Sequence, residues 1–293
     1  MHEVKADEGE SVPGLRNVEV RLRRGAVRPR DEYFELLDAL AARDAGSRLD
    51  SFTSTCGLGR AALTGGALGA WQTLHLVWAA WAASRLARGG LEREEREAAL
   101  LGLAWSLFMV LLCVYHWSEF LVTMRFNAPV GACESFLLDQ SRQYQVAMGV
   151  SMAEFWLEAW LAPGLKTALP CRALMLLGFA LCVMGQVFRS GAMWQAGSNF
   201  THVIQTEKVK GHRLVTSGLY SVVRHPSYFG WFWWSVGTQL LVCNPVSCLG
   251  FAAAGYAFFK GRIPVEERLL EQFFPDEFPA FRQRTPTGIP FLK

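Results

Sequence analysis

Three short segments in the C-terminal third hold most of the residues that can take part in chemistry. They are residues 211–220, 224–230 and 262–267, and between them they supply histidines, arginines, tyrosines and two adjacent glutamates. Tyrosine rings attract cations to their faces, and a glutamate accepts hydrogen bonds from hydroxyl and ammonium groups. A guanidinium can hold a carboxylate in one orientation. Together these residue types predict a binding site for charged small molecules.

The same residues also have a simpler interpretation, in which they only mark the ends of helices. Residues 224–226, Arg-His-Pro, have the composition of a basic cap at the start of a membrane helix, where proline is favoured in the first turn. Glu266 and Glu267 are equally typical of the start of a solvated helix. The combination of Tyr220 and Tyr228 with Glu266 favours the binding site over this interpretation.

No metal site is expected in this sequence. Its seven cysteines are scattered and form no C-x-x-C pair, so they indicate neither a zinc site nor a disulfide framework. His116 and Glu119 share one helix face, and Glu154 and Glu158 share another. A di-iron carboxylate site needs more histidine ligands than these. We therefore interpret the four residues as polar clamps between the second and third of the helices predicted below.

Six apolar runs are available to position the chemical segments. Hydrophobic residues make up 51% of the chain, and the mean hydropathy is +0.17. A helix that spans a membrane needs about 20 mostly apolar residues. The runs are residues 57–84, 98–122, 144–162, 172–188, 226–243 and 246–259. The sequence therefore predicts an all-α polytopic membrane protein with about six transmembrane helices, the last two forming a hairpin.

The runs divide the chain into three regions. Residues 1–55 are polar, and no signal peptide is expected because residues 1–50 are charged and contain no apolar stretch. Residues 56–193 are predicted to hold four transmembrane helices, and residues 194–293 a catalytic region with the hairpin inside it. The net charge of +3 is spread over the ends of the apolar runs. A nucleic-acid partner is excluded because it would require a concentrated basic stripe.

A hairpin returns the chain to the side of the membrane that it left. The polar segments on either side of the hairpin, residues 194–225 and 260–293, are therefore predicted to share one face. Both are rich in lysine and arginine, which places that face in the cytosol by the positive-inside rule. The turn at residues 85–97 then falls on the opposite face, although it contains four arginines.

These motifs resemble the isoprenylcysteine carboxyl methyltransferase family, which methylates the prenylated C-terminal cysteine of CaaX proteins. The R-H-P-x-Y-x-G core at residues 224–230 is shared with a wider group of membrane methyltransferases and reductases. Further likeness is found at residues 115–123, 139–144, 196–205, 262–267 and 284–291. The resemblance covers roughly residues 103–293. Animal members resemble an eight-span design that begins with a hydrophobic hairpin, whereas residues 1–54 here are charged.

The resemblance implies a methyl donor, an acceptor and the residues that contact each. The donor would be S-adenosylmethionine, and the acceptors would be prenylated proteins of the small GTPase type at the endoplasmic reticulum membrane. Arg262 would face the acceptor. Arg189 is a second candidate for that role, although its default interpretation is a residue that snorkels to the membrane interface. The donor would contact Gln205, His212, Arg213, Leu214, Val215, Tyr220, His225, Pro226, Ser227, Tyr228 and Glu266.

Three other functions remain open at this stage. One is methylation of another membrane substrate, such as a phospholipid amine or a small isoprenoid. The second is a membrane reductase that uses a nicotinamide cofactor, whose phosphates would need more basic partners than residues 211–220 supply. The third is a non-catalytic membrane scaffold. The aromatic run at residues 229–234 fits either the mouth of a groove for a prenyl chain or an aromatic belt at the membrane interface.

Overall fold

A computed structural model describes residues 58–127, 133–138, 140–208 and 211–292. Within these ranges every regular element is a helix, as the sequence predicts. The polar N-terminal region, residues 1–55, lies outside the described residues, as does Asp139. The long helices are α4 (Leu58–Arg88), α5 (Arg93–Phe126), α6 (Arg142–Leu161), α8 (Leu169–Ala196), α10 (Pro226–Leu241) and α11 (Pro245–Phe273). The short ones are η2 (Cys133–Phe136), α7 (Pro163–Lys166), η3 (Gly197–Asn199), α9 (Leu219–Val222) and α12 (Phe278–Arg284).

Each of the six apolar runs becomes one long helix. Among the described residues, two helices are long and apolar enough in their own right to cross a membrane, namely α5 and the helical stretch 169–199. The 16 residues of α10 reach about 24 Å at the helical rise per residue, which is less than the thickness of a bilayer core. The number of membrane spans therefore stays a prediction.

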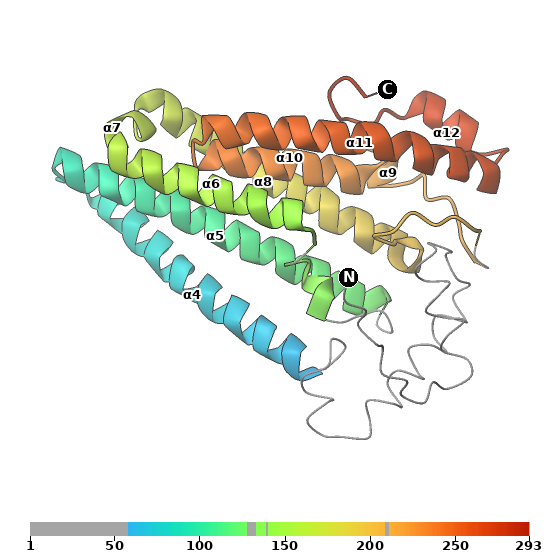
Figure 1. The fold of residues 1–293 in the computed structure, drawn as a ribbon, viewed down its shortest axis with the longest axis horizontal. Coiled ribbons are helices and arrows are strands. Elements are labelled where there is room, and N and C mark those ends of the chain that lie inside the picture. Colours follow the sequence, from blue (N-terminus) through green and yellow to red (C-terminus); the bar gives the residue numbers. More distant parts are fainter. Residues whose placement is uncertain (1–57, 128–132, 139, 209–210, 293) are drawn as a thin grey trace, which may run out of the picture.

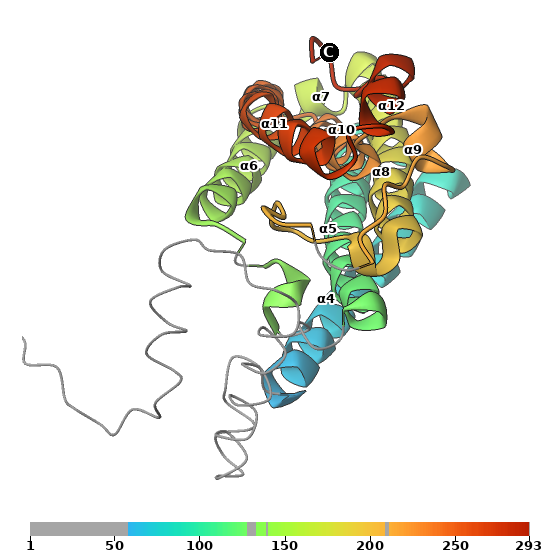
Figure 2. The same cartoon turned by 90° about the vertical axis from the view of Figure 1, so that its right-hand side faces the viewer.

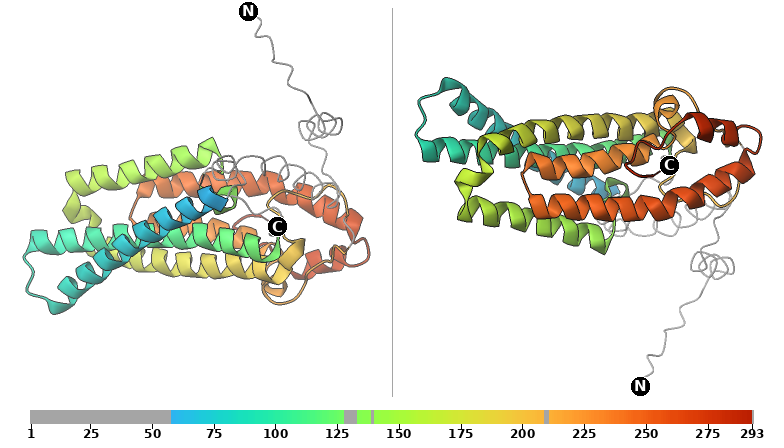
Figure 3. Two further views of the ribbon diagram at one scale, coloured as in Figure 1. Left: turned by 90° about the horizontal axis from the view of Figure 1, so that it is seen from below. Right: turned by 90° about the horizontal axis from the view of Figure 1, so that it is seen from above.

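The long helices lie side by side along one axis, so the molecule has two ends (Figure 1). The α4–α5 turn, α7 and the α10–α11 turn lie at one end (Figure 3). The end of α8, the loop that follows it, α9, α12 and the last turns of α11 lie at the other end. The two polar segments that flank the α10–α11 hairpin therefore share one end of the molecule, and the arginine-rich turn at residues 85–97 lies at the opposite end.

The last long helix is longer than the sequence indicated. The apolar run ends at residue 259, but α11 continues to Phe273 and includes Pro264 in its interior. Proline removes one backbone donor and usually interrupts a helix. Because α11 continues past Pro264, Arg262 and Glu266 lie one helical turn apart on a rigid extension of the hairpin rather than on a separate segment.

The helices α8 and α10 approach each other through glycines. Gly178 and Gly185 on α8 face Gly237 and Gly230 on α10, so each helix presents a glycine every seven residues. A Cβ atom added at Gly230 would lie 2.5 Å from the backbone nitrogen of Arg189 and 2.6 Å from the carbonyl oxygen of Gly185. The two backbones are thus in direct contact, as small residues allow in membrane helix pairs.

The aromatic run at residues 229–234 contributes to the core. Trp234 is only 1% exposed, and its ring stacks on that of Tyr115 with the centroids 4.5 Å apart. Phe232 is also buried, in a second cluster with Phe259 and Ile263. The interpretation of the whole run as a groove mouth or interfacial belt is therefore wrong for Phe232 and Trp234, because the α10 face that carries them packs against other helices.

The ionisable residues in the second and third long helices are clamps, but most have other partners than expected. His116 and Tyr144 do join α5 to α6, with Nε2 and the tyrosine hydroxyl 3.4 Å apart. Glu154, however, accepts hydrogen bonds from two backbone nitrogens in the first turn of α11, at 2.8 and 2.7 Å. This carboxylate satisfies donors that a helix start leaves unpaired. Among the described residues, no group of histidine, cysteine and carboxylate side chains is arranged to hold a metal ion.

Lys166 is the most deeply buried lysine that the structure describes, at 4% exposure, and the sequence did not single it out. Its ammonium group donates to Glu158 at 2.6 Å, to the carbonyl oxygen of Cys243 at 2.8 Å and to the side-chain oxygen of Asn244 at 3.0 Å. These three bonds join α6 and α7 to the α10–α11 turn. A buried charge of this kind is tolerated because all its donors are used.

Replacing Lys166 with methionine is therefore expected to destabilise the protein. The change removes three hydrogen bonds and leaves two acceptors in the turn without a donor, a loss of about 1–3 kcal/mol. The measurement is the midpoint of thermal unfolding in detergent micelles. Lys260→Met, at an exposed position on α11, is the matched control and should leave the midpoint within about one degree. Equal midpoints for the two variants would contradict the assigned role of Lys166.

Candidate active site

A cavity of about 900 Å³, counting the space open to solvent at its mouth, lies at the end of the bundle that holds α9 and α12. Its walls come from the end of α8, the loop that follows α8, α9, the start of α10, the last turns of α11 and Phe281 of α12. Figure 2 shows these elements gathered at one end of the bundle. All eleven residues that the resemblance assigned to a donor line this cavity, and so does Arg262; Arg189 does not line it.

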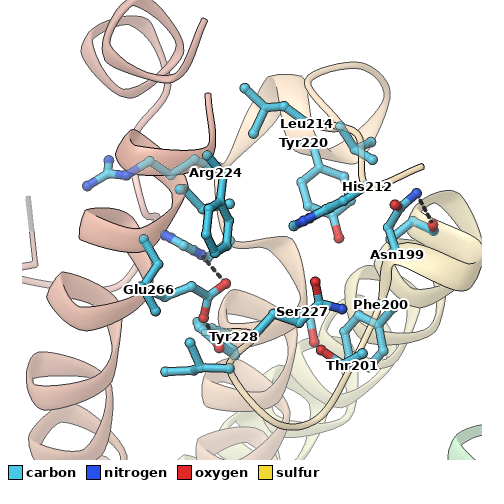
Figure 4. A pocket seen from close by; sticks show the side chains of 18 of the residues that line it. Asn199, Phe200, Thr201, His212, Leu214, Tyr220, Arg224, Ser227, Tyr228 and Glu266 are labelled. Carbon is cyan, nitrogen blue, oxygen red and sulfur yellow. Dashed lines mark hydrogen bonds and ion pairs between the residues drawn. The ribbon is translucent and has the colours of Figure 1, made fainter. Parts of the chain in front are cut away.

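Tyr228 occupies the floor of the cavity between two charged residues of α11. Its hydroxyl donates a hydrogen bond to Glu266 and accepts one from Arg262 Nε at 2.8 Å. Its ring lies parallel to that of His225, with the centroids 5.4 Å apart. Figure 4 shows Glu266 and Tyr228 facing Tyr220 across the same space. Glu266 of α11 thus forms one surface with Tyr220 and Tyr228, which lie more than thirty positions earlier in the sequence.

Arg262 is held from two sides. Besides its bond to Tyr228, its Nη2 donates to the carbonyl oxygen of His202 at 2.7 Å, and its guanidinium lies 5.7 Å from the ring centre of Phe258. Nη1 has no hydrogen-bond partner among the residues that the structure describes. The guanidinium is therefore fixed in orientation and still has donors available at the cavity wall.

Arg189 is committed to an internal ion pair. It donates to the two oxygens of Glu119 at 2.5 and 3.0 Å and to the hydroxyl of Ser227 at 2.6 Å. Glu119 has no exposed surface, and Arg189 is only 6% exposed. The interpretation of Arg189 as a snorkelling residue is therefore wrong, because its charge is neutralised inside the bundle. The pair joins α5 to α8 and positions Ser227 at the start of α10.

Arg224 and His225 meet Glu267 behind the cavity wall. Arg224 Nε lies 2.5 Å and His225 Nε2 3.0 Å from the same carboxylate oxygen. The backbone nitrogen and the guanidinium of Arg224 also donate to the carbonyls of Pro286 and Thr285, both at 2.9 Å. The interpretation of Arg224 as a basic helix cap is therefore wrong: the side chain holds the C-terminal segment and α11 against α10.

The charge of Glu267 is stabilised by these contacts. Burial by itself would raise the pKa of the carboxyl, but the hydrogen bonds from His225 and Arg224 lower the pKa below its ordinary value. Glu267 is therefore ionised at neutral pH and forms a lasting ion pair with Arg224. This pairing leaves Glu266, its neighbour in sequence, as the carboxylate that faces the cavity.

The loop between α8 and α9 is fastened over the cavity at several points. Lys208 donates to the carbonyl of Phe273 at 2.6 Å and lies 4.4 Å from the ring centre of Phe274, at the end of α11. At the other end of the loop, Gln195 accepts from the backbone nitrogen of Leu219 at 3.0 Å. Gly218 has a φ of +61°, and an added Cβ there would meet the Gln195 side chain. Glycine is required for this close approach.

Two buried polar atoms in the wall have no partner among the described residues. They are Oε1 of Gln205 and Nδ1 of His212. Burial, together with the nearby charge of Lys208, lowers the pKa of His212 below its ordinary value, so its ring is neutral at pH 7. Buried polar groups are nearly always hydrogen-bonded, so these two atoms indicate that a polar ligand completes the wall.

Sequence reasoning missed several residues that the structure places at or beside the site. Asn199, Phe200 and Thr201 line the cavity, while Lys208 and His202 hold the loop and Arg262. The sequence identified the segment 196–205, which contains His202, as a motif of the family. The sequence could not show the role of His202, because that role depends on contacts to Glu119 and Arg262, which are 83 and 60 positions away.

Comparisons with known proteins agree with this picture. Residues 176–272 match the model of the isoprenylcysteine carboxyl methyltransferase family. The protein-S-isoprenylcysteine O-methyltransferases of Xenopus laevis and Homo sapiens are both 44% identical to this chain, over 182 and 193 residues. These matches cover 62% and 65% of this chain and 62% and 67% of the two relatives. The chain thus spans roughly two thirds of the length of these animal relatives.

A yeast relative and a solved structure extend the match. The enzyme of the same name from Saccharomyces cerevisiae is 39% identical over 191 residues, which cover 64% of this chain and 80% of that protein. A solved structure of the eukaryotic intramembrane Ras methyltransferase is similar with a TM-score of 0.62 and 36% identity. That match covers 67% of this chain and 75% of the other. This chain therefore belongs to the isoprenylcysteine carboxyl methyltransferase family.

Proposed function

We propose that this protein transfers a methyl group from S-adenosylmethionine to the C-terminal carboxylate of prenylated cysteine in CaaX-type proteins, such as small GTPases. The product is a methyl ester. The observation that supports this function best is the composition of one cavity, which is lined by a fixed guanidinium, by Glu266 and by the polar loop residues at the end of a bundle of apolar helices. The same arrangement favours a carboxylate as acceptor, because an amine acceptor would favour acidic or aromatic walls over Arg262.

The cavity wall suits a donor that carries a cation, hydroxyl groups and a heterocycle. Bound S-adenosylmethionine would supply a methyl group on a positively charged sulfur. Glu266 can accept from hydroxyl or ammonium groups, and the unpaired atoms of Gln205 and His212 can complete hydrogen bonds to polar edges. The rings of Tyr220 and Tyr228 present faces that attract a cation. The residues present therefore fit this group.

The acceptor needs alignment rather than activation. An α-carboxyl group has a pKa of about 3.3–3.7 and is already ionised at neutral pH, so no general base is required. Arg262 can hold the carboxylate in one orientation through donors that its protein contacts leave available. Correct placement of two reactants contributes about 7–11 kcal/mol to such a reaction. Arg262 must not bind the carboxylate too tightly, because the carboxylate loses its charge as the ester forms and tight binding of the charged form would slow the reaction.

The prenyl chain explains why the site lies at the end of a membrane bundle. A farnesyl or geranylgeranyl chain is most stable in lipid, and a helix bundle can admit it from the side. The carboxylate then stays at the polar end, where residues of the segments 196–205 and 212–228 and the end of α11 line the cavity. We place this end in the cytosol because residues 194–225 and 260–293 are both basic, and we place the protein in the endoplasmic reticulum by its family.

The direct test is an assay with membranes that contain the protein. Labelled S-adenosylmethionine and N-acetyl-farnesylcysteine should yield a base-labile labelled methyl ester. A folded sample that forms no ester would refute the proposed function. Parallel reactions with phosphatidylethanolamine and with a free isoprenoid acid decide between this function and methylation of another membrane substrate, because label in either compound would support the alternative.

Glu266→Ala is expected to weaken donor binding. The change removes a charged acceptor from the cavity wall, and hydrogen bonds to charged groups are worth about 1.5–3 kcal/mol, or roughly 10- to 150-fold in affinity. Titration calorimetry with S-adenosylhomocysteine measures the effect. Glu271→Ala is the matched control, since that exposed glutamate on the same helix pairs with Arg282 outside the cavity. Unchanged affinity in Glu266→Ala would show that the carboxylate does not contact the donor.

A further inference from the structure

His202 contacts Arg262 directly and also contacts Glu119, the carboxylate that pairs with the buried Arg189. Its ring nitrogen Nε2 lies 2.8 Å from Oε2 of Glu119, the carboxylate that binds Arg189. Its backbone carbonyl accepts a hydrogen bond from Arg262 at 2.7 Å. One residue of the α8–α9 loop therefore touches the partner of one arginine through its side chain and the other arginine through its backbone.

The side-chain contact determines where the backbone carbonyl lies. Glu119 is fully buried and is held in turn by Arg189, so it is a rigid anchor within the bundle. The imidazole of His202 donates to this carboxylate, and its ring also packs edge to face on Phe200 at 5.2 Å between centroids. Loops without regular structure are otherwise the most mobile parts of a fold. The ring thus fastens the loop at the residue whose carbonyl orients Arg262.

His202 itself is not part of the cavity wall. Its neighbours Thr201 and Val203 line the cavity, whereas His202 points from the loop into the bundle. The donor-binding residues of the loop, such as Gln205 and His212, are fastened separately through Lys208 and α11. Removing the His202 ring should therefore disturb Arg262 more than it disturbs the donor site.

We propose that His202 is a positioning residue that orients the Arg262 guanidinium toward the acceptor carboxylate by tying the α8–α9 loop to Glu119. This inference rests on the proposed function, in which Arg262 binds that carboxylate. A small displacement of such a group has a large effect on rate, because alignment supplies most of the catalysis. The ring must carry a hydrogen on Nε2 to donate to Glu119, so a side-chain amide of similar reach can replace it in part.

The test compares three variants in the ester-forming assay. His202→Ala is expected to lower kcat/KM for N-acetyl-farnesylcysteine about 10- to 30-fold, with the dissociation constant of S-adenosylhomocysteine within about twofold of the wild type. His202→Gln should recover part of the loss because its amide nitrogen can donate to Glu119. Asn127→Ala is the matched control: its side chain donates to the carbonyl of Phe200 on the same loop at 3.3 Å but touches neither arginine. It should stay close to the wild type.

A double-mutant cycle identifies Arg262 as the mediator. If His202 acts through Arg262, His202→Ala should cost clearly less in an Arg262→Lys background than in the wild type. Equal costs in both backgrounds would overturn the proposal. So would full activity in His202→Ala, or parallel losses of activity and S-adenosylhomocysteine binding in both His202→Ala and His202→Gln. A wild-type protein that forms no ester would instead refute the proposed function, and this inference with it.

Discussion

Replacing Arg262 with alanine should lower kcat/KM for N-acetyl-farnesylcysteine about 100-fold, while the affinity for S-adenosylhomocysteine changes by less than about threefold. The expected loss corresponds to the charged hydrogen bonds that a guanidinium makes to a carboxylate. The donor site should survive because Glu266 keeps its contacts to Tyr228 and His225, and the loop keeps its bond from Lys208 to Phe273. Steady-state kinetics with the acceptor varied, combined with calorimetry for the donor product, separates the two effects.

Two further substitutions make the Arg262 result specific. Arg262→Lys keeps the charge but loses the planar fork that Tyr228 and His202 orient, so activity should fall between that of the wild type and that of the alanine variant. Arg268→Ala removes an exposed arginine from the same helix and should leave the kinetics unchanged. If Arg262→Ala weakened donor binding as much as acceptor use, Arg262 would belong to the donor site instead.

Gly230→Ala should prevent normal folding or lower the unfolding midpoint by many degrees. The new methyl group would lie 2.5 Å from a backbone nitrogen and 2.6 Å from a backbone oxygen of α8, and neither can move without separating the two helices. Overpacking in a core costs about 1–3 kcal/mol even where side chains can adjust, so contact with backbone should cost at least the upper figure. Thermal unfolding in detergent and size-exclusion profiles measure the effect.

The matched control for this change is Gly250→Ala. Gly250 lies inside α11, and an added Cβ there has no neighbour within 4 Å. Alanine is favoured over glycine in a helix interior by about 1 kcal/mol, so this variant should be as stable as the wild type or slightly more stable. If the Gly230→Ala and Gly250→Ala proteins had the same midpoint of thermal unfolding, α8 and α10 would not pack in direct backbone contact.

Much of the helical framework was predictable from the sequence because its signals are local. The lengths of the apolar runs placed six helices, and proline in the first turn marks the start of α8, α10 and α11. Residues 244 and 245 separate the last two apolar runs, and the structure places the hairpin turn between Leu241 and Pro245. The cavity residues could be named because they form short motifs on either side of this hairpin. A hairpin brings such segments to one end whatever its detailed packing.

The extension of α11 could not be predicted, because the apolar signal stops before the helix does. Residues 260–273 are polar and contain Pro264, which favours a break. The helix persists because its far end is fastened from other elements, by Lys208 at Phe273 and by Arg224 at Glu267. Both are long-range contacts, and the composition of α11 does not indicate that Lys208 and Arg224 are the partners.

The same distinction applies to the charged residues of the interior. Periodicity showed that Glu119, Glu154 and Glu158 lie on helix faces within apolar surroundings, where a charge must find a partner. It could not identify those partners, since Arg189, the start of α11 and Lys166 come from other helices whose rotation and depth are decided by packing. The local sequence thus determines which residue types are present and where the hairpin forms. The pairing of buried charges, and with it the orientation of Arg262, arises only when the helices dock, because a buried charge is stabilised by whichever opposite charge the packed bundle brings within reach.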